Sequence, residues 1–314
     1  MDGQFMNKIR ILLLAIHYPF AIKNYFERAI RRNPHLDLIT VGPFTGNWIP
    51  WMGGMNLPEK YSIPPTYPLP FKPNIGRVNY ELVRAQMPHE WKPDLVLTID
   101  AGINWTHKPS EGVVASVFTD GHCLDYTHTR GVSDYCFNLH PSYSAVGDKV
   151  LHYAYDPAEH YPMTDVEKDA DAVLIGMPYE QRVQWVNALR EKGLNVLFEN
   201  GPIFDEYRRL NNRARIGMNW ASIQDMNARV FELMAMRLCP VINRVPDLGL
   251  FFDEDRHYLG FETLPEAIEK VLWAKENPRK AQMIADVAYQ NVTQKNLTYD
   301  KLVLDILREC KLYA

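Results

Sequence analysis

Short apolar runs alternate with amphipathic stretches along the first part of the chain. Residues 9–16 read IRILLLAI, which predicts a strand that is buried on both faces. Residues 24–34 (NYFERAIRRNP) have helical spacing, and residues 36–43 (LDLITVGP) return to a strand pattern. A strand, a helix and a strand in this order are how a doubly wound parallel sheet begins.

The alternation breaks over residues 42–76, which are rich in Pro and Gly and include Trp48, Trp51, Tyr61 and Tyr67. A loop of this length inside a compact domain is usually functional or mobile. Aromatic faces could stack on a sugar ring or a base, and packing within the loop is the alternative.

Three further apolar runs, at residues 93–100, 112–120 and 132–139, each have an acid or a polar residue at or next to their end. Ligands of open α/β sheets bind at such strand ends. Residues 151–162 (LHYAYDPAEHYP) then have the composition of an interdomain hinge.

A second α/β series follows the hinge. It contains a helix over about 179–192, and the tail over 264–312 is helical with breaks near Pro278 and Asn296. We therefore expect two Rossmann-like domains joined by a hinge. The strands of the second series are expected within residues 170–178, 194–202, 213–220 and 239–244.

Composition supports this division and narrows the function classes. At 314 residues the chain exceeds one typical core, which favours two domains. The net charge is −4, so the chain lacks the excess of positive charge with which proteins bind nucleic acid or an anionic membrane. Basic pairs at Arg31–Arg32 and Arg208–Arg209 could still form a local patch.

The apolar run at Ile11–Ile16 is too short to span a bilayer. The four cysteines, with no CxxC pair, favour reduced thiols in a cytoplasmic protein, and the oligomeric state stays open.

Asp225 to Glu232 offers what a nucleotide ligand requires. Asp225 or Asn227 could cap the next helix, leaving its first N–H groups for a diphosphate. Arg229 adds positive charge, and Glu232 could accept hydrogen bonds from a ribose diol. The alternative is an ordinary capped helix with one exposed acid.

Gly176 ends a predicted strand, where a glycine lets a ligand approach the backbone closely. Arg182, in the following helix, could reach back toward a phosphate. A plain strand-to-helix turn is the alternative for both residues.

In the first half, Asp120 and His122 follow a strand end. They could orient an acceptor hydroxyl or exchange a proton with it, and a polar turn before Gly121 is the alternative. Both residues are expected to face a cleft between the two domains, and His17 could line the same cleft.

We expect no metal site. The Asp-x-Asp forms at residues 169–171 and 253–255 are common by chance, and the histidines lack the HExxH spacing of zinc sites.

Several segments follow one another in the order of a known family, and together they resemble the CgeB-like glycosyltransferases. These are relatives of the retaining family-4 group with the GT-B fold. The resemblance covers about residues 93–312 and is most specific from Arg215 to Arg244 and in the tail. The segments are SDYCFNLHPSYSAVG, DAVLIGMPYEQRVQWVNAL, MNARVFELMAMRLCPVINRVPDLGLFF and LPEAIEKVLWAKENPRKAQMIADVAYQNVTQKNLTYDKLVLDIL.

The resemblance implies two Rossmann-like domains that face each other across a cleft, with a final helix that crosses back to the first domain. We expect an acceptor-side domain over 1–155 with the tail 298–314, and a nucleotide-sugar-binding domain over 156–297.

In this family pattern Asn227 to Glu232 matches Asn-x-Arg-Val-Phe-Glu, Glu232 holds the ribose, and the backbone before it cradles the diphosphate. Gly176 then lies beside the donor phosphates or sugar, and Arg182 matches a basic residue of the family. No metal or cofactor is required, because helix N-termini and Arg neutralise the leaving diphosphate.

One position departs from the family pattern. Gln224 stands where these enzymes often carry a glutamate that contacts the donor sugar, which puts the sugar and the retaining outcome in question.

The expected function is transfer of a sugar from a nucleotide-sugar donor, UDP- or GDP-linked, to an unidentified acceptor. The acceptor classes are a glycan, a protein, a small molecule or a modified nucleic-acid base, the last disfavoured by the acidic charge. The alternatives are a non-catalytic nucleotide-sugar or glycan-binding protein of the same fold and, more weakly, a nucleotide-sugar epimerase.

Overall fold

The computed structural model describes residues 8–49, 54–71, 76–100, 102–221 and 223–313. The chain divides into two compact units. The first unit comprises Met1–His152 and Tyr299–Ala314, and the second comprises Tyr153–Thr298. The domain boundaries expected from the sequence, after residues 155 and 297, fall close to these points.

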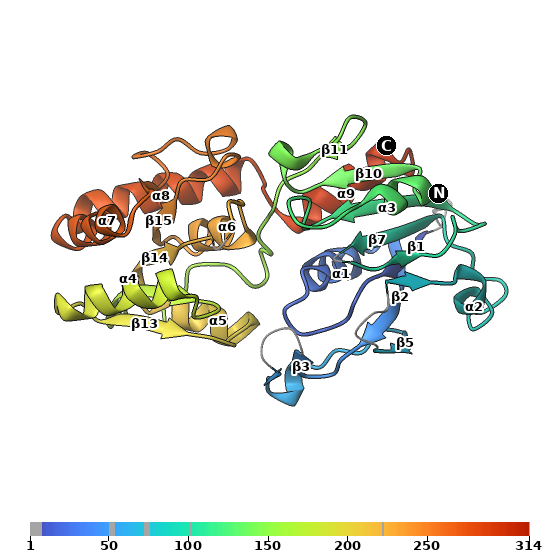
Figure 1. Ribbon diagram of the computed structural model, residues 1–314, viewed down its shortest axis with the longest axis horizontal. Helices are drawn as coiled ribbons and strands as arrows, with labels where there is room; N and C mark the ends of the chain where they lie inside the picture. Colours follow the sequence, from blue (N-terminus) through green and yellow to red (C-terminus); the bar gives the residue numbers. More distant parts are fainter. Residues whose placement is uncertain (1–7, 50–53, 72–75, 101, 222, 314) are drawn as a thin grey trace, which may run out of the picture. The chain divides into compact units, whose positions relative to one another are not determined.

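The first unit is built on a parallel sheet of seven strands within the described residues, in the order β11-β10-β9-β7-β1-β2-β5 (Figure 1). The order reverses at β1, because β2 and β5 continue on one side of it and the later strands on the other. The strands are β1 (Ile9–Leu14), β2 (Leu36–Phe44), β5 (Tyr67–Pro70), β7 (Leu95–Asp100), β9 (Val113–Phe118), β10 (Tyr135–Asn138) and β11 (Lys149–Val150).

Between residues 42 and 76, the part of the chain that the structure describes is more regular than the sequence indicates. A two-stranded antiparallel ladder, β3 (Trp48–Ile49) with β4 (Met55–Asn56), precedes the 3₁₀ turn η2 (Glu59–Tyr61), and β5 joins the sheet. β5 carries two prolines, which an edge strand tolerates because one of its sides needs no ladder hydrogen bonds. The expectation of one continuous loop was therefore wrong, and Trp51 lies outside the described residues.

The end of the chain returns to the first unit, as the resemblance implied. In Figure 1 the red helix α9 (Tyr299–Glu309) lies among the elements of this unit, and it packs against α1 (Lys23–Arg32). The Tyr299 ring stacks on Tyr25, with 5.2 Å between centroids, and meets the edge of Phe26 at 5.1 Å. Shorter elements complete the unit: α2 (Tyr80–Arg84), α3 (Thr127–Val132), η3 (Pro141–Tyr143) and the pair β6 (Arg77–Val78) with β8 (Asn104–Trp105).

The second unit is built on a parallel sheet of five strands, counted over the described residues, in the order β13-β12-β14-β15-β16. β12 is the first strand in sequence, and the next two lie on its opposite sides, so the order reverses between β12 and β14. The strands are β12 (Ala170–Ile175), β13 (Val196–Glu199), β14 (Ala214–Asn219), β15 (Cys239–Asn243) and β16 (Leu259–Phe261).

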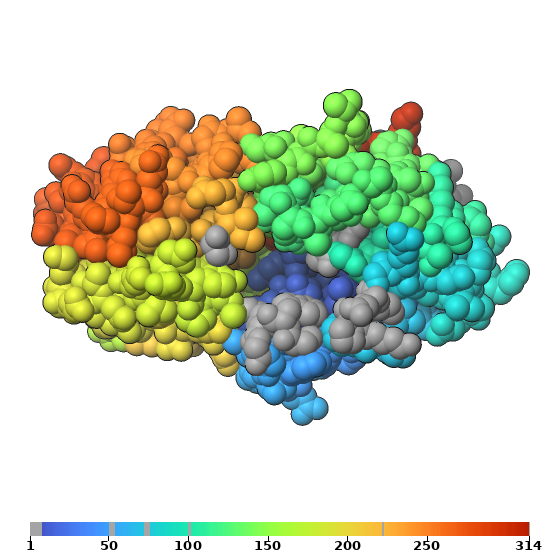
Figure 2. All heavy atoms as spheres, in the orientation of Figure 1, coloured from blue at the N-terminus to red at the C-terminus, as the bar shows by residue number. Residues whose placement is uncertain are grey.

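Helices cover this sheet, and the breaks expected in the tail are present. α8 begins at Pro278, which has no N–H to lose at the first helical position, and the left-handed Asn296 (φ 52°) follows its end. Figure 2 shows the yellow-green surface around α4 against the orange surface around α7, and the two helices contact each other. The helices are α4 (Glu180–Glu191), α5 (Phe204–Asn212), α6 (Ala228–Ala235), α7 (Leu264–Glu276) and α8 (Pro278–Gln294), with η4 (Leu248–Leu250).

The prediction of an α/β fold with parallel sheets is thus confirmed. No helix in the described ranges is both long and apolar enough to cross a membrane.

Candidate functional site

The candidate donor site lies at the carboxyl ends of β12 and β14, where the strand order of the second unit reverses. Ligands of open α/β sheets bind at such a point. Gly176 directly follows β12, and Asn219 is the last residue of β14. The two predicted ligand segments, around Gly176 and at the start of α6, therefore meet at one edge of the sheet.

Arg229 connects these two strand ends. Its Nη1 donates a hydrogen bond of 2.8 Å to Oδ1 of Asn219. A Cβ atom added to Gly176 would lie 2.7 Å from Nη2 of Arg229. The guanidinium thus lies directly against the Gly176 backbone, and it is partly exposed. Its Nε is buried with no hydrogen-bond partner among the described residues.

Gly176 has a backbone φ of +151°, and its nearest neighbours are the two arginines. A side chain at this position would be strained and would displace a guanidinium. The glycine is therefore required by its surroundings in the protein, whatever ligand approaches it.

Arg182 is more deeply buried than expected for a phosphate ligand. Its Nε and Nη2 donate to the carbonyl of Trp220 at 2.9 and 2.7 Å, and its Nη1 donates to the carbonyl of Met177 at 3.1 Å. Burial and the neighbouring Arg229 lower the pKa of Arg182 to about 10. The side chain thus fastens the turn after β12 to the end of β14, and its contact with a phosphate stays a prediction.

The N-terminus of α6 begins at Asn227, as the sequence suggested, but the side chain does not cap it. Asn227 makes no side-chain cap hydrogen bond, and its amide lies 3.4 Å from Oδ1 of Asn219. The first turn contains no acid. The backbone N–H groups of this turn are thus left uncapped by Asn227, and Gln224 before it is exposed.

Glu232 is a buried residue, so the alternative of an exposed acid on an ordinary helix was wrong. It is 7% exposed and accepts a hydrogen bond of 2.7 Å from the hydroxyl of Tyr207 in α5. Burial raises the pKa of Tyr207 well above its usual value, so its hydroxyl stays protonated and donates.

His160 approaches the other oxygen of the same carboxylate, with 3.8 Å between its Nε2 and Oε1 of Glu232. Its Nδ1 lies 3.0 Å from the backbone N–H of Asp156, which makes Nδ1 an acceptor. A neutral His160 therefore carries its proton on Nε2, on the side of Glu232.

Sequence reasoning missed Tyr207, His160 and Asn219. Tyr207 lies in a strongly polar helix, and His160 lies in the segment that we interpreted only as a hinge. The one available signal for Asn219 was its position at the end of an apolar run.

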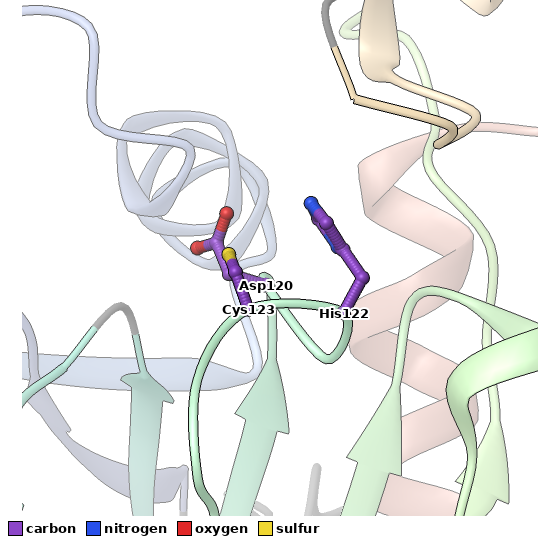
Figure 3. Close-up of side chains that lie close together, drawn as sticks. All are labelled: Asp120, His122 and Cys123. Carbon is purple, nitrogen blue, oxygen red and sulfur yellow. The ribbon is translucent and has the colours of Figure 1, made fainter.

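In the first unit, Asp120 and His122 occupy the turn after β9, as the sequence suggested. Figure 3 shows that the neighbouring Cys123 belongs to the same group, and one ligand atom from each of the three lies within 4.8 Å of the others. His17 is instead fully buried. Its Nε2 lies 3.2 Å from the Val41 carbonyl, and burial lowers its pKa to about 3.

The two Asp-x-Asp forms are engaged in ion pairs. Asp169 pairs with Arg213 and Asp171 with Lys275, at 2.7 and 2.6 Å. In the triplet at residues 253–255, the central Glu254 forms an ion pair of 2.6 Å with Arg244. Its two aspartates are also near cations: Arg256 lies 3.3 Å from Asp253 and Lys270 lies 3.7 Å from Asp255.

A pocket of about 570 Å³ between α7 and α8 contains none of the predicted donor residues. Its lining includes Trp273, Met283 and Ile284, with charged side chains such as Lys280. The candidate donor site is therefore defined by the strand ends and not by this pocket.

Part of the chain is similar to a known protein family. Residues 162–308, which include the strand ends and α6, match the family described as "Glycosyl transferase-like". No curated protein sequence matches the chain.

The fold is similar to solved structures over nearly the whole chain. A glycosyltransferase from Rickettsia africae ESF-5 has a TM-score of 0.67 at 10% identity, over 97% of this chain and 98% of that one. Anabaena Alr3699/HepE in complex with UDP-glucose has a TM-score of 0.62 at 11% identity, over 96% and 99%. Sucrose-phosphate synthase from Thermosynechococcus elongatus has a TM-score of 0.60 at 12% identity, over 97% and 98%.

At these identities the similarity establishes the fold, and the family match adds the activity. Residues 162–308 form a glycosyl transferase-like domain within a chain of the GT-B fold, and the protein is a glycosyltransferase.

Proposed function

We propose that the protein transfers a sugar from a nucleotide-sugar donor that binds at the strand ends of the second unit. The observation that carries this proposal is the pairing, on α6, of a buried carboxylate at Glu232 with a guanidinium at Arg229. A carboxylate accepts hydrogen bonds from the two hydroxyls of a ribose, and a guanidinium with nearby backbone N–H groups binds a diphosphate.

The donor contacts are assigned by position along α6 and β12. The ribose is assigned to Glu232, and the diphosphate to Arg229 with the N-terminal turn that begins at Asn227. Gly176 lets the phosphates or the sugar approach the backbone, and Arg182 supports the same turn through its carbonyl contacts.

A uridine- or guanosine-linked donor is proposed, and the Anabaena protein of the same fold, which was solved with UDP-glucose, supports the uridine form. The diphosphate needs no metal in this proposal, because the helix N-terminus and Arg229 neutralise it. The proposed outcome is retaining, with the donor phosphate taking the acceptor proton, and Gln224 near the sugar is the position that determines sugar choice.

The acceptor hydroxyl is assigned to Asp120 and His122 in the first unit. The acceptor is a glycan, a protein, a small molecule or, less favoured, a modified nucleic-acid base. The CgeB-like group of glycosyltransferases is the proposed subgroup, based on the motif from Asn227 to Glu232 and the helical tail.

The proposal is tested by hydrolysis of nucleotide sugars in the absence of an acceptor. Wild-type protein is incubated with uridine, guanosine, adenosine and thymidine diphosphate sugars, and release of the free diphosphate is measured. The expected result is slow release from one donor class, lost in Glu232→Ala and retained in Glu191→Ala, which removes an exposed acid of α4.

Two other outcomes contradict the proposal. Tight binding of a nucleotide sugar without any turnover, with or without candidate acceptors, identifies a binding protein of the same fold. Conversion of the sugar to an epimer without transfer, seen by product analysis, identifies an epimerase.

A further inference from the structure

The turn after β9 brings three different kinds of metal-binding group together. Asp120 supplies a carboxylate, His122 an imidazole and Cys123 a thiol, and one ligand atom of each lies within 4.8 Å of the other two. In Figure 3 the three side chains extend in the same general direction from the turn, with the carboxylate and the sulfur next to each other and the imidazole farther along the turn. The turn follows the carboxyl end of a parallel strand, where ligands of such sheets bind.

The backbone of this turn is held by hydrogen bonds. The N–H groups of Cys123 and Leu124 both donate to the carbonyl of Asp120 at 3.0 Å. The N–H of Asp120 donates to the hydroxyl of Tyr126 at 3.1 Å. A Cβ atom at Gly121 would lie 3.0 Å from the Asn138 side chain, so the turn packs closely over the next strand.

Two of the three side chains are also oriented by neighbours. The hydroxyl of Thr119 donates to Oδ2 of Asp120 at 2.7 Å. The His122 ring meets the edge of His140, with 5.0 Å between centroids, and lies 5.4 Å from the ring of Tyr143. Hydrogen bonds and packing of this kind hold the ligands of metal sites in place before the ion arrives. Cys123 is the exposed member of the group.

We propose that Asp120, His122 and Cys123 bind one zinc ion. Sulfur, imidazole nitrogen and carboxylate oxygen are the three ligand types that zinc uses, and magnesium or calcium would not select a thiolate. Three protein ligands leave the fourth tetrahedral position for water or for a hydroxyl or thiol of a substrate.

The geometry requires only a small adjustment. With bonds of about 2.0–2.3 Å, tetrahedral zinc ligands lie roughly 3.3–3.8 Å from one another, so the group must contract by about 1 Å. A rotation of the exposed Cys123 side chain can supply this movement.

Two of the three ligands, Asp120 and His122, are the residues assigned above to the acceptor hydroxyl, and the zinc site itself is argued from the first unit alone. The expectation of no metal site rested on the two Asp-x-Asp forms and on the spacing of the histidines. The Asp-x-His-Cys sequence of this turn matches neither motif.

The test is zinc binding by the metal-free full chain, measured by competition with a chromogenic chelator and followed by cobalt substitution. We expect one zinc ion per chain in the wild type. Cys123→Ser and His122→Ala should each weaken zinc binding by more than about tenfold. Removal of a residue that only hydrogen-bonds to a metal ligand already lowers metal affinity by about this factor. The sulfur-to-cobalt charge-transfer band should disappear in Cys123→Ser.

Matched controls separate this site from adventitious binding. Cys136→Ser and His107→Ala remove another cysteine and an exposed histidine of the first unit, and both should bind like the wild type. Cys123 is exposed, so its serine variant should keep the wild-type melting temperature. Equal binding by Cys123→Ser and the wild type, or no zinc bound at a free concentration of about 10 µM, would overturn the proposal.

Discussion

The hydroxyl of Tyr207 donates a hydrogen bond of 2.7 Å to Oε2 of Glu232, and both side chains are buried in the second unit. Tyr207 belongs to α5 and Glu232 to α6, so the contact fixes one helix against the other. It also fixes the direction in which the carboxylate presents its remaining lone pairs. In the proposed donor site, this orientation exists before the ribose binds.

Replacing Tyr207 with Phe should therefore weaken donor binding as well as stability. The ring packing stays, but a hydrogen bond to a charged group is lost, which typically costs about 1.5–3 kcal/mol. We expect the variant to unfold at a lower urea concentration. We also expect its KM for the nucleotide sugar to rise by a larger factor than its kcat falls. An unchanged KM in a protein that has lost stability would show that Tyr207 has only a structural role.

Arg229→Gln should reduce affinity for the diphosphate far more than for the nucleoside. A charge-assisted contact to phosphate is worth about 1.5–3 kcal/mol, so the Kd for the nucleoside diphosphate should rise at least about tenfold. Calorimetry with the diphosphate and the nucleoside separates the two effects. Arg209→Gln removes an exposed arginine of α5 and serves as the control. Equal losses in both arginine variants would argue against a specific phosphate contact.

Gly176→Ala should cost stability and donor affinity together. The new Cβ would lie 2.7 Å from Nη2 of Arg229, on a backbone with φ of +151° that side chains rarely adopt. Strain of this kind typically costs about 1–3 kcal/mol. Gly249→Ala, where a Cβ would meet no atom within 4 Å, is the matched control in the same unit. Similar melting temperatures for the two variants would contradict this reading.

His17 should make the first unit acid-sensitive. Its folded pKa of about 3 lies below the ordinary 6.5, because burial disfavours the charged ring and Lys23 adds to this effect. Between these two values the unfolded chain binds a proton that the folded His17 does not. Stability is therefore unaffected by this group above pH 6.5 and falls as the pH drops toward 3, by at most about 5 kcal/mol.

His17→Gln tests this expectation, because its amide can still donate to the Val41 carbonyl. Unfolding free energies of both proteins are measured from pH 7 to pH 4. The difference between them should grow in favour of the variant as the pH falls. A difference that stays constant with pH would show that His17 does not carry the acid sensitivity.

The sequence predicts the sheet-forming strands well, because runs that are buried on both faces have few other structures available. Residues 170–178 contain β12, and the breaks at Pro278 and Asn296 separate the last three helices as expected. β5 was missed because its prolines argue against a strand, and only its place at the sheet edge accommodates them.

The candidate sites were predictable only in part. The position of Glu232 on a helix followed from local spacing, whereas its partner Tyr207 is 25 residues away in sequence. Arg182 resembled a phosphate ligand in sequence, but its partners are carbonyls that the fold brings close to it. Contacts between elements depend on packing, which a single sequence does not display.

The most direct test of the account is a thermal-shift screen of the wild type and Glu232→Ala against uridine, guanosine, adenosine and thymidine diphosphate sugars. One nucleotide class should raise the melting temperature of the wild type, and Glu232→Ala, though folded, should show no such response. A well-folded wild-type protein that no nucleotide sugar stabilises would contradict the proposed donor site, and α6 would then serve only to build the domain.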